Sequence, residues 1–196
     1  MQIAPITLKG RFVNLVPMAV DHVHDLAQVG IDEGIWRYMR YGQILSEEEL
    51  HQWVEELLEL QAGGTDLPFT VIDMESLKPI GATRYLEIQP GNRSLEIGGT
   101  WYGRAYQGTL VNTECKYMLL KHAFEELKCV RVQFKTDVRN LRSQRAIERL
   151  GAVKEGVLRQ HIILQDGTLR SSVFFSILDA EWPAVKTRLQ ERLAGG

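Results

Sequence analysis

Cysteines, long apolar runs and an excess of either charge are scarce in this chain of 196 residues. Its two cysteines, Cys115 and Cys129, can build neither a disulfide framework nor a zinc site. No apolar run approaches the ~18 residues of a membrane-spanning helix, so we expect no contact with a membrane. Lys and Arg number 23 against 25 for Asp and Glu, a formal net charge of -2. The chain as a whole therefore has no positive field for binding nucleic acid.

Several cofactor and catalytic motifs are absent as well. There is no G-x-G-x-x-G after a strand and no G-x-x-x-x-G-K, so no dinucleotide or P-loop phosphate site is indicated. Neither H-E-x-x-H nor G-x-S-x-G occurs. His22 and His24 lie two apart on a predicted helix, where side chains diverge, so we expect exposed imidazoles and no metal site. Residues 1–5 lack the features of a signal peptide, and we expect a cytoplasmic protein.

What is present is the composition of an ordinary folded protein, with 44% apolar and 24% charged residues. We predict one domain over residues 1–196, because the length suits one domain and no linker or repeat interrupts the chain. Ser46 and Glu49 form a capping box ahead of a helix that ends at Gly63 and Gly64. Further helices are predicted at 21–29, 109–128 and 141–150, and strands at 11–17, 67–73, 80–88, 94–102 and 130–135, with two closing strands around a turn at 166–167.

This order of elements predicts an α/β (α+β) fold with one central sheet. The three strands between residues 67 and 102 follow one another across short turns, as in an antiparallel meander. Helix, strand, helix and two strands then follow, without the regular alternation of a doubly wound fold.

Two stretches of the sequence resemble a known family. The first is W-Y-G-R-A-Y-Q-G-T-L-V-N at 101–112, leading into a helix; the second is N-L-R-S at 140–143, followed by E-R-L-G-A at 148–152 and E-G-V-L-R at 155–159. Together they resemble the GNAT superfamily of acyl-CoA N-acyltransferases, specifically its ribosomal-protein N-acetyltransferase (RimJ/RimL-like) branch, over nearly the whole chain. The resemblance implies the GNAT fold, a twisted and mostly antiparallel sheet flanked by helices, with acetyl-CoA in the split between the fourth and fifth strands.

The resemblance also implies a phosphate site at the start of the helix near residue 109. Backbone N–H groups and the positive end of a helix dipole favour an anion there. The family pattern is Q/R-x-x-G-x-G/A, which Gln107 opens, but Leu110 and Asn112 stand at its last two conserved positions. Backbone amides can still donate, whereas a plain helix start without a ligand is the alternative. The implied cofactor-binding residues are Thr100, Trp101, Tyr102, Gln107, Gly108, Thr109, Leu110, Val111, Asn112, Asn140, Arg142 and Arg145.

Glu96 is the candidate general base. It stands eleven positions before Gln107, the spacing at which many family members carry a catalytic glutamate. A carboxylate there could take the proton of the attacking ammonium, directly or through water. An ion pair with Arg84 or Arg93 is the alternative reading, and Glu87 is the second candidate base. Some members of this branch carry an acidic residue at the position of Ile162, so the sequence does not decide which residue is the general base.

Ser143 is the candidate acid for the thiolate of CoA, because no tyrosine occurs between residues 141 and 151. By resemblance, Asn140 bonds the pantetheine arm of acetyl-CoA and Arg142 and Arg145 contact its 3′-phosphate. Asn140 and Ser143 could equally cap the helix, and the arginines could form a solvated basic face. Gly98 and the glycine after it suit a β-bulge that frees a backbone N–H for the oxyanion.

The resemblance implies an acetyl-CoA-dependent N-acetyltransferase in which an amine attacks the thioester directly. Its acceptor would be a protein N-terminal α-amine, such as that of a ribosomal protein. A small amine (polyamine, amino sugar or toxin) and a catalytically weak acyl-CoA-binding protein are the alternatives. No metal and no nucleic acid are expected, and a homodimer stays open. Trp36, Tyr38, Met39 and Tyr41 could line the acceptor slot or pack a helix onto the sheet.

Overall fold

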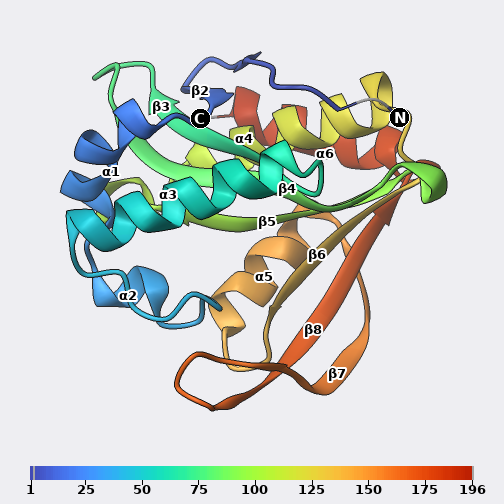
Figure 1. Ribbon diagram of the computed structural model, residues 1–196. Coiled ribbons are helices and arrows are strands. Elements are labelled where there is room, and N and C mark those ends of the chain that lie inside the picture. Colours follow the sequence, from blue (N-terminus) through green and yellow to red (C-terminus); the bar gives the residue numbers. More distant parts are fainter. Residues whose placement is uncertain (2, 196) are drawn as a thin grey trace.

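The computed structural model describes residue 1 and residues 3–195, which form one eight-stranded sheet with helices on both faces (Figure 1). The strands are β1 (Leu8–Lys9), β2 (Val13–Pro17), β3 (Leu67–Asp73), β4 (Pro79–Gln89), β5 (Ser94–Tyr102), β6 (Arg131–Asp137), β7 (Val153–Ile163) and β8 (Leu169–Leu178). The helices are α1 (Val23–Gly30), α2 (Glu33–Trp36), α3 (Glu47–Ala62), α4 (Val111–Lys121), α5 (Leu141–Leu150) and α6 (Trp182–Ala194). The predicted fold class is confirmed, whereas β1, α2 and α6 were not predicted.

The sheet runs in the order β1-β2-β3-β4-β5-β6-β8-β7, and all its neighbours are antiparallel except β5 and β6. These two parallel strands pair only where residues 94–96 meet residues 131–133. Beyond this point they diverge, and Figure 1 shows the gap between them widening away from their shared start. The predicted split between the fourth and fifth strands is therefore the fork between β5 and β6, since the short β1 shifts the numbering by one.

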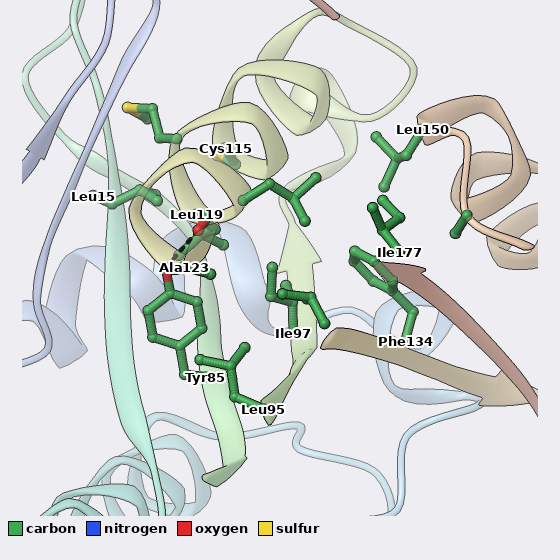
Figure 2. Packing of buried hydrophobic residues seen from close by; sticks show 14 of the residues in the cluster. Leu15, Tyr85, Leu95, Ile97, Cys115, Leu119, Ala123, Phe134, Leu150 and Ile177 are labelled. Carbon is green, nitrogen blue, oxygen red and sulfur yellow. Dashed lines mark hydrogen bonds between the residues drawn. The ribbon is translucent and has the colours of Figure 1, made fainter. Parts of the chain in front are cut away.

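Two hydrophobic clusters lie on opposite faces of the sheet. The larger one is covered by α4 and α6 and contains Tyr85, whose hydroxyl donates to the carbonyl of Leu119 at 2.6 Å (Figure 2). The smaller one is covered by α1 and α3, and in it the indole rings of Trp36, Trp53 and Trp101 pack with centroids 5.4–6.2 Å apart. Side chains that alternate along β4 and β5 thus reach two different environments.

A β-bulge interrupts the pairing of β4 with β5. Ala82 pairs with Trp101, but Arg84 pairs with Gly98, so β5 carries one extra residue between the two pairs. Gly99 lies within this stretch at φ +56°, a conformation that a side chain disfavours. The bulge expected from the two glycines is therefore confirmed, and it lies beside the fork.

Local signals set the helix ends. The hydroxyl of Ser46 accepts from the backbone N–H of Glu49 at 3.1 Å, and the Glu49 carboxylate accepts from that of residue 45. Gly151 ends α5 at φ +102°, as a C′ glycine does. After α4 a π-helical turn, His122–Glu126, continues toward β6. Within the described residues, none of the helices has the length and apolarity needed to cross a membrane.

Candidate active site

A cleft of about 520 Å³ opens where β5 and β6 diverge. Its lining residues come from both faces of the sheet. The helix side consists of Gln107, Gly108, Thr109, Asn112, Thr113, Lys116, Asn140, Arg142, Ser143, Ala146, Ile147, Arg149, Leu150 and Arg192. The loop side consists of Gly34 and Ile35 of α2, residues 37–41 of the following loop, Arg84, Ile162 and Arg170. The two sides meet at Glu96, the Gly98–Gly99 bulge and residues 134–136 of β6.

Glu96 lies at the base of the fork and is 2% exposed. Its Oε2 accepts from the side-chain amide of Gln133 at 2.9 Å and lies 3.2 Å from the ammonium of Lys135. Both partners come from β6, so the fork itself positions the carboxylate. An ion pair was foreseen, but with Arg84 or Arg93; Arg84 instead lies 3.1 Å from an aspartate just before β3, Asp66.

The second candidate base is far less well placed. Glu87 is exposed, lies at φ +50° beside a second irregularity of the β4–β5 pairing, and is not among the residues that line the cleft. Ile162 does line the cleft, next to His161, whose Nδ1 is 3.1 Å from the hydroxyl of Ser172. Of the described carboxylates, only Glu96 lines the cleft.

The turn before α4 is held by Gln107. Its side-chain amide donates to the carbonyl of Tyr102 at 2.8 Å, and its Oε1 accepts from Arg142 at 2.8 Å. Gly108 has φ +82°, and a Cβ added there would meet no atom within 4 Å. The hydroxyl of Thr109 donates to the carbonyl of residue 106 and accepts from the N–H of residue 111, which orders the turn. The turn is therefore formed and uncrowded despite its departures from the family pattern.

Three of the predicted cofactor contacts lie outside the cleft lining. The side chain of Val111 is buried in the larger cluster, because it faces the sheet from the first turn of α4. Leu110 and Arg145 are also absent from the lining. Arg145 points to solvent from α5, whereas Arg149, one turn later on that helix, lines the cleft together with Arg192 of α6. A contact from Val111 or Leu110 would therefore have to come from its backbone.

At the start of α5, the pair of Asn140 and Ser143 both caps the helix and lines the cleft. The side-chain oxygen of Asn140 accepts from the backbone N–H of Ser143 at 3.0 Å, so Asn140 is the N-cap of α5. Both residues also line the cleft, and Ser143 is half-buried there. Thr100, Trp101 and Tyr102 line it as well.

The buried thiol of Cys115 has no part in this surface. Burial raises its pKa to about 12, so the thiol is protonated at neutral pH and a poor nucleophile.

The phenol of Tyr102 donates to the side chain of Asn112 at 3.2 Å, and burial raises the pKa of this phenol well above its ordinary value.

Lys116 is a cleft residue that the sequence did not reveal. It is 5% exposed and donates to the hydroxyls of Thr83, at 3.2 Å, and Thr100. Burial lowers its pKa to about 8. The neighbouring Glu114 turns away and accepts from the backbone N–H groups of residues 11–13. Lys116 therefore faces the cleft without a carboxylate among the described residues within 4.0 Å.

Two buried arginines hold the loop side of the cleft in place. Arg84 is 1% exposed and donates to the hydroxyl of Tyr41, whose ring packs edge-on against the ring of Trp53. Arg170 donates to the backbone carbonyl of Tyr38 at 3.1 Å. Tyr38, Met39 and Tyr41 line the cleft, as expected of residues that form an acceptor slot. Trp36 instead is buried in the smaller cluster and packs the helices onto the sheet.

The histidines near the N-terminus depart in part from expectation. His24 is exposed, but His22 is half-buried and its Nδ1 lies 2.9 Å from the hydroxyl of Thr70 on β3. Among the described residues, no group of three or more His, Cys, Asp or Glu could hold a metal ion.

Comparison with known proteins decides the family. The family model described as Acetyltransferase (GNAT) domain matches residues 13–153, which include β2 to α5 and the fork. The chain belongs to the GNAT acetyltransferase family. Members of this family use acetyl-CoA as co-substrate.

Two curated relatives narrow the comparison. The chain is 26% identical to the ribosomal-protein-serine acetyltransferase of Escherichia coli over 172 residues, which cover 86% of this chain and 94% of that protein. It is 34% identical over 95 residues to a Bacillus subtilis protein provisionally named ribosomal N-acetyltransferase YdaF. That match spans 48% of this chain and about half, 51%, of the relative's length.

A solved structure extends the likeness to the whole fold. A protein from T. thermophilus, provisionally described as an acetyltransferase, superposes with a TM-score of 0.89 at 38% identity. The superposition covers 98% of this chain and 100% of that one.

The residues of the cleft fit acetyl-CoA in chemistry. Arginine and lysine side chains suit phosphate, and the helix side carries Arg142, Arg149, Arg192 and Lys116. The N-terminus of α4 opens on the same side and adds backbone N–H groups. The apolar residues Ile147 and Leu150 of α5 also line the cleft.

Proposed function

We propose that this GNAT protein transfers the acetyl group of acetyl-CoA to a primary amine, the N-terminal α-amine of a protein. The observation that carries the proposal is the buried carboxylate of Glu96 at the base of the fork, where the helix side and the loop side meet. A protein acceptor is supported by the relative from Escherichia coli whose name specifies a ribosomal protein. Residues 37–41 of the loop after α2 line the cleft, and we propose that an extended chain end binds against them.

In this mechanism acetyl-CoA supplies the activated acetyl group as a thioester. Glu96 removes a proton from the ammonium of the acceptor, because only the neutral amine is a nucleophile. A backbone N–H of the Gly98–Gly99 bulge donates to the carbonyl oxygen as negative charge develops on it. Ser143 donates a proton to the departing thiolate and takes up the second proton that the attacking nitrogen loses, so the serine ends the step neutral. The thiolate needs little help because thiols have a pKa near 8–9.

We further propose that the helix side binds the cofactor. The N-terminus of α4 would hold the pyrophosphate, and Asn140 the pantetheine arm. Arg142, Arg149 and Arg192 are the arginines that line the helix side, and we propose them as contacts of the 3′-phosphate, with Arg149 in place of Arg145, which is not in the lining. Action in the cytoplasm and assembly as a homodimer stay predictions.

Two alternatives remain distinct from this proposal. A small-molecule amine would use the same chemistry with a different occupant of the loop side. A catalytically weak acyl-CoA-binding protein is motivated by Leu110 and Asn112 in the pyrophosphate turn and by the absence of a tyrosine in residues 141–150.

The variant Glu96→Gln tests the proposed role of the carboxylate. Glutamine keeps the size and can still bond Gln133 but cannot accept a proton. We expect kcat for acetyl transfer to a peptide amine to fall about 10²-fold or more. The rise in Tm that acetyl-CoA causes should be unchanged. Thiol release measures the first quantity, and thermal unfolding measures the second.

Glu87→Gln is the matched control, because Glu87 is an exposed carboxylate outside the cleft. Its kcat should equal that of the wild type. Equal rates for Glu96→Gln and wild type would rule out Glu96 as the base. A wild-type protein that binds acetyl-CoA but releases no thiol with any amine would favour the weak-binder alternative.

A further inference from the structure

The lining of the cleft is strongly positive, although the chain as a whole is slightly negative. The chain carries a formal net charge of -2, yet of the described residues that line the cleft nine are Arg or Lys and one, Glu96, is acidic. Four of the nine, Lys116, Arg142, Arg149 and Arg192, belong to the helix side. The other five, Arg37, Arg40, Arg84, Lys135 and Arg170, lie on the loop side or at the fork. Phosphates bound on the helix side would leave the charge of these five unexplained.

Carboxylates neutralise only part of this charge. Lys135 pairs with Glu96, and Arg84 lies 3.1 Å from Asp66. Arg170 is 4.0 Å from Asp137, which already binds Arg139 at 2.7 Å. One carboxylate thus serves two guanidinium groups, and positive charge is left over at the loop side.

Arg37 and Arg40 add to the excess at the rim. Both are exposed, and their guanidinium carbons lie 5.5 Å and 5.3 Å from the ring centroids of Tyr38 and Tyr41. No carboxylate of residues 3–195 lies within 4.0 Å of either arginine. Stacking on aromatic rings holds the two cations at the mouth of the cleft without consuming their hydrogen-bonding capacity.

The buried arginines also retain unused donors. Nη1 of Arg84 and Nε of Arg170 are buried and have no hydrogen-bond acceptor among the described atoms. Burial, followed by the positive charges of Lys135 and Arg170, lowers the pKa of His161 beside them. The loop side therefore has a positive potential from several directions.

A positive potential acts on an amine acceptor in two ways. It lowers the pKa of a bound amine, which favours the neutral nucleophile, and it repels acceptors that carry further ammonium groups. It attracts an anion attached to the acceptor, and arginine pairs well with carboxylate. Polyamines and amino sugars are poor matches for such a site.

We infer that the acceptor of this enzyme carries a carboxylate within a residue or so of its reactive amine, and that Arg37, Arg40 and Arg170 recognise it. This inference rests on the proposed function, whose acceptor it specifies. An acidic residue behind a protein N-terminus and the carboxylate of a free amino acid share this chemistry.

Acetyl transfer to matched peptides tests the inference. Four-residue peptide amides that differ only at the second position, Ser-Glu-Ala-Ala, Ser-Ala-Ala-Ala and Ser-Lys-Ala-Ala, are compared with free glutamate. We expect kcat/KM for the acidic peptide to exceed that of the neutral peptide about tenfold, with the basic peptide lowest. Salt at roughly 0.5 M should reduce the preference, because the rim arginines are exposed. Free glutamate matching the acidic peptide would support the shared chemistry and identify a small acceptor.

The double variant Arg37→Gln/Arg40→Gln assigns the preference to residues. Both side chains are exposed, so the fold should persist, and kcat/KM should fall about tenfold more for the acidic peptide than for the neutral peptide. Arg159→Gln removes an exposed arginine of β7 outside the cleft and should keep the full preference. An unchanged preference in the double variant would overturn the assignment to these arginines.

Calorimetric titration of the same peptides into protein saturated with CoA separates this inference from the proposed function. Tighter binding of the acidic peptide supports it even if no thiol is released, in which case only the proposed function fails. Equal or tighter binding of the neutral or basic peptide would overturn it, whatever the rate of turnover.

Discussion

The two sides of the cleft differ in how the chain builds them. The helix side comes from two short stretches, 107–116 and 140–150, each at the start of a helix, with one arginine added from α6. The loop side joins part of α2 and the loop at 37–41 to Arg84 of β4 and Arg170 of β8. The bond from Arg170 to Tyr38 spans 132 positions of sequence. A local motif can reveal the first side, whereas only the tertiary fold assembles the second.

A buried cation of the loop side, Arg84, and one of the helix side, Lys116, are stabilised differently. Arg84 has Asp66 within 3.1 Å, and both are buried. Lys116 has only the hydroxyls of Thr83 and Thr100. A paired buried charge holds its surroundings together, while a buried ammonium without a carboxylate lowers the stability of the fold. We conclude that Arg84 belongs to the framework of the loop side, whereas Lys116 is a charge that the helix side keeps for a ligand.

The largest expected effect is from Arg84→Met. Methionine has a similar volume but leaves Asp66 buried without its partner, and removing one member of a buried pair costs about 3–5 kcal/mol. The free energy of unfolding, measured in denaturant, should fall by that amount. The increase in stability that acetyl-CoA causes should persist in the variant, because the helix side is not touched.

Arg104→Gln is the control for this variant. Arg104 also pairs with an aspartate, Asp32, but its side chain is 79% exposed. Its loss should leave the midpoint of unfolding nearly unchanged. Equal losses for the two variants would contradict the assignment of Arg84 to a buried framework.

The variant Lys116→Met tests the unpaired charge of Lys116 through the pH dependence of stability. Burial lowers the pKa of Lys116 from 10.5 to about 8, so between these values the unfolded chain binds the proton more tightly than the folded one. Stability therefore rises with pH across this window. The difference in the free energy of unfolding, wild type minus variant, should increase by at most about 3 kcal/mol between pH 7 and pH 10.5. Parallel pH profiles would mean that Lys116 is not a buried ammonium.

Gly99→Ala has a smaller effect and acts where the two sides meet. At φ +56° an alanine costs about 1–2 kcal/mol, and its Cβ would lie 3.1 Å from Nε of Arg84. Gly64→Ala isolates the backbone penalty, because Gly64 has φ +75° and open space around it. Only Gly99→Ala should also slow acetyl transfer. Equal rates in both variants would contradict the proposed role of the bulge.

Much of the fold could be predicted because its signals are local. The capping box at Ser46 and the glycine pair of β5 each act within a few residues, and the structure contains both features. Helix α6 was missed although Trp182, Val185 and Leu189 are spaced as one buried helical face. The spacing of these three residues is a local signal for the helix.

The partners of the site residues were less predictable. Glu96 could be singled out by its spacing from Gln107, but its partner Lys135 follows from the pairing of β5 with β6. Lys116 lies in a predicted helix, and nothing local shows that it turns toward Thr83 and the cleft. Ion pairs across a sheet depend on register, which no short motif encodes.

Thermal unfolding with and without acetyl-CoA tests the central claim most directly, namely that the fork between β5 and β6 binds this cofactor on its helix side. At a hundred times Kd the ligand adds about 2.7 kcal/mol, which raises Tm by roughly 5–10 °C for a protein of this size. We predict this rise despite Leu110 and Asn112, because backbone amides and arginines supply the contacts. An unchanged Tm at millimolar acetyl-CoA would contradict it.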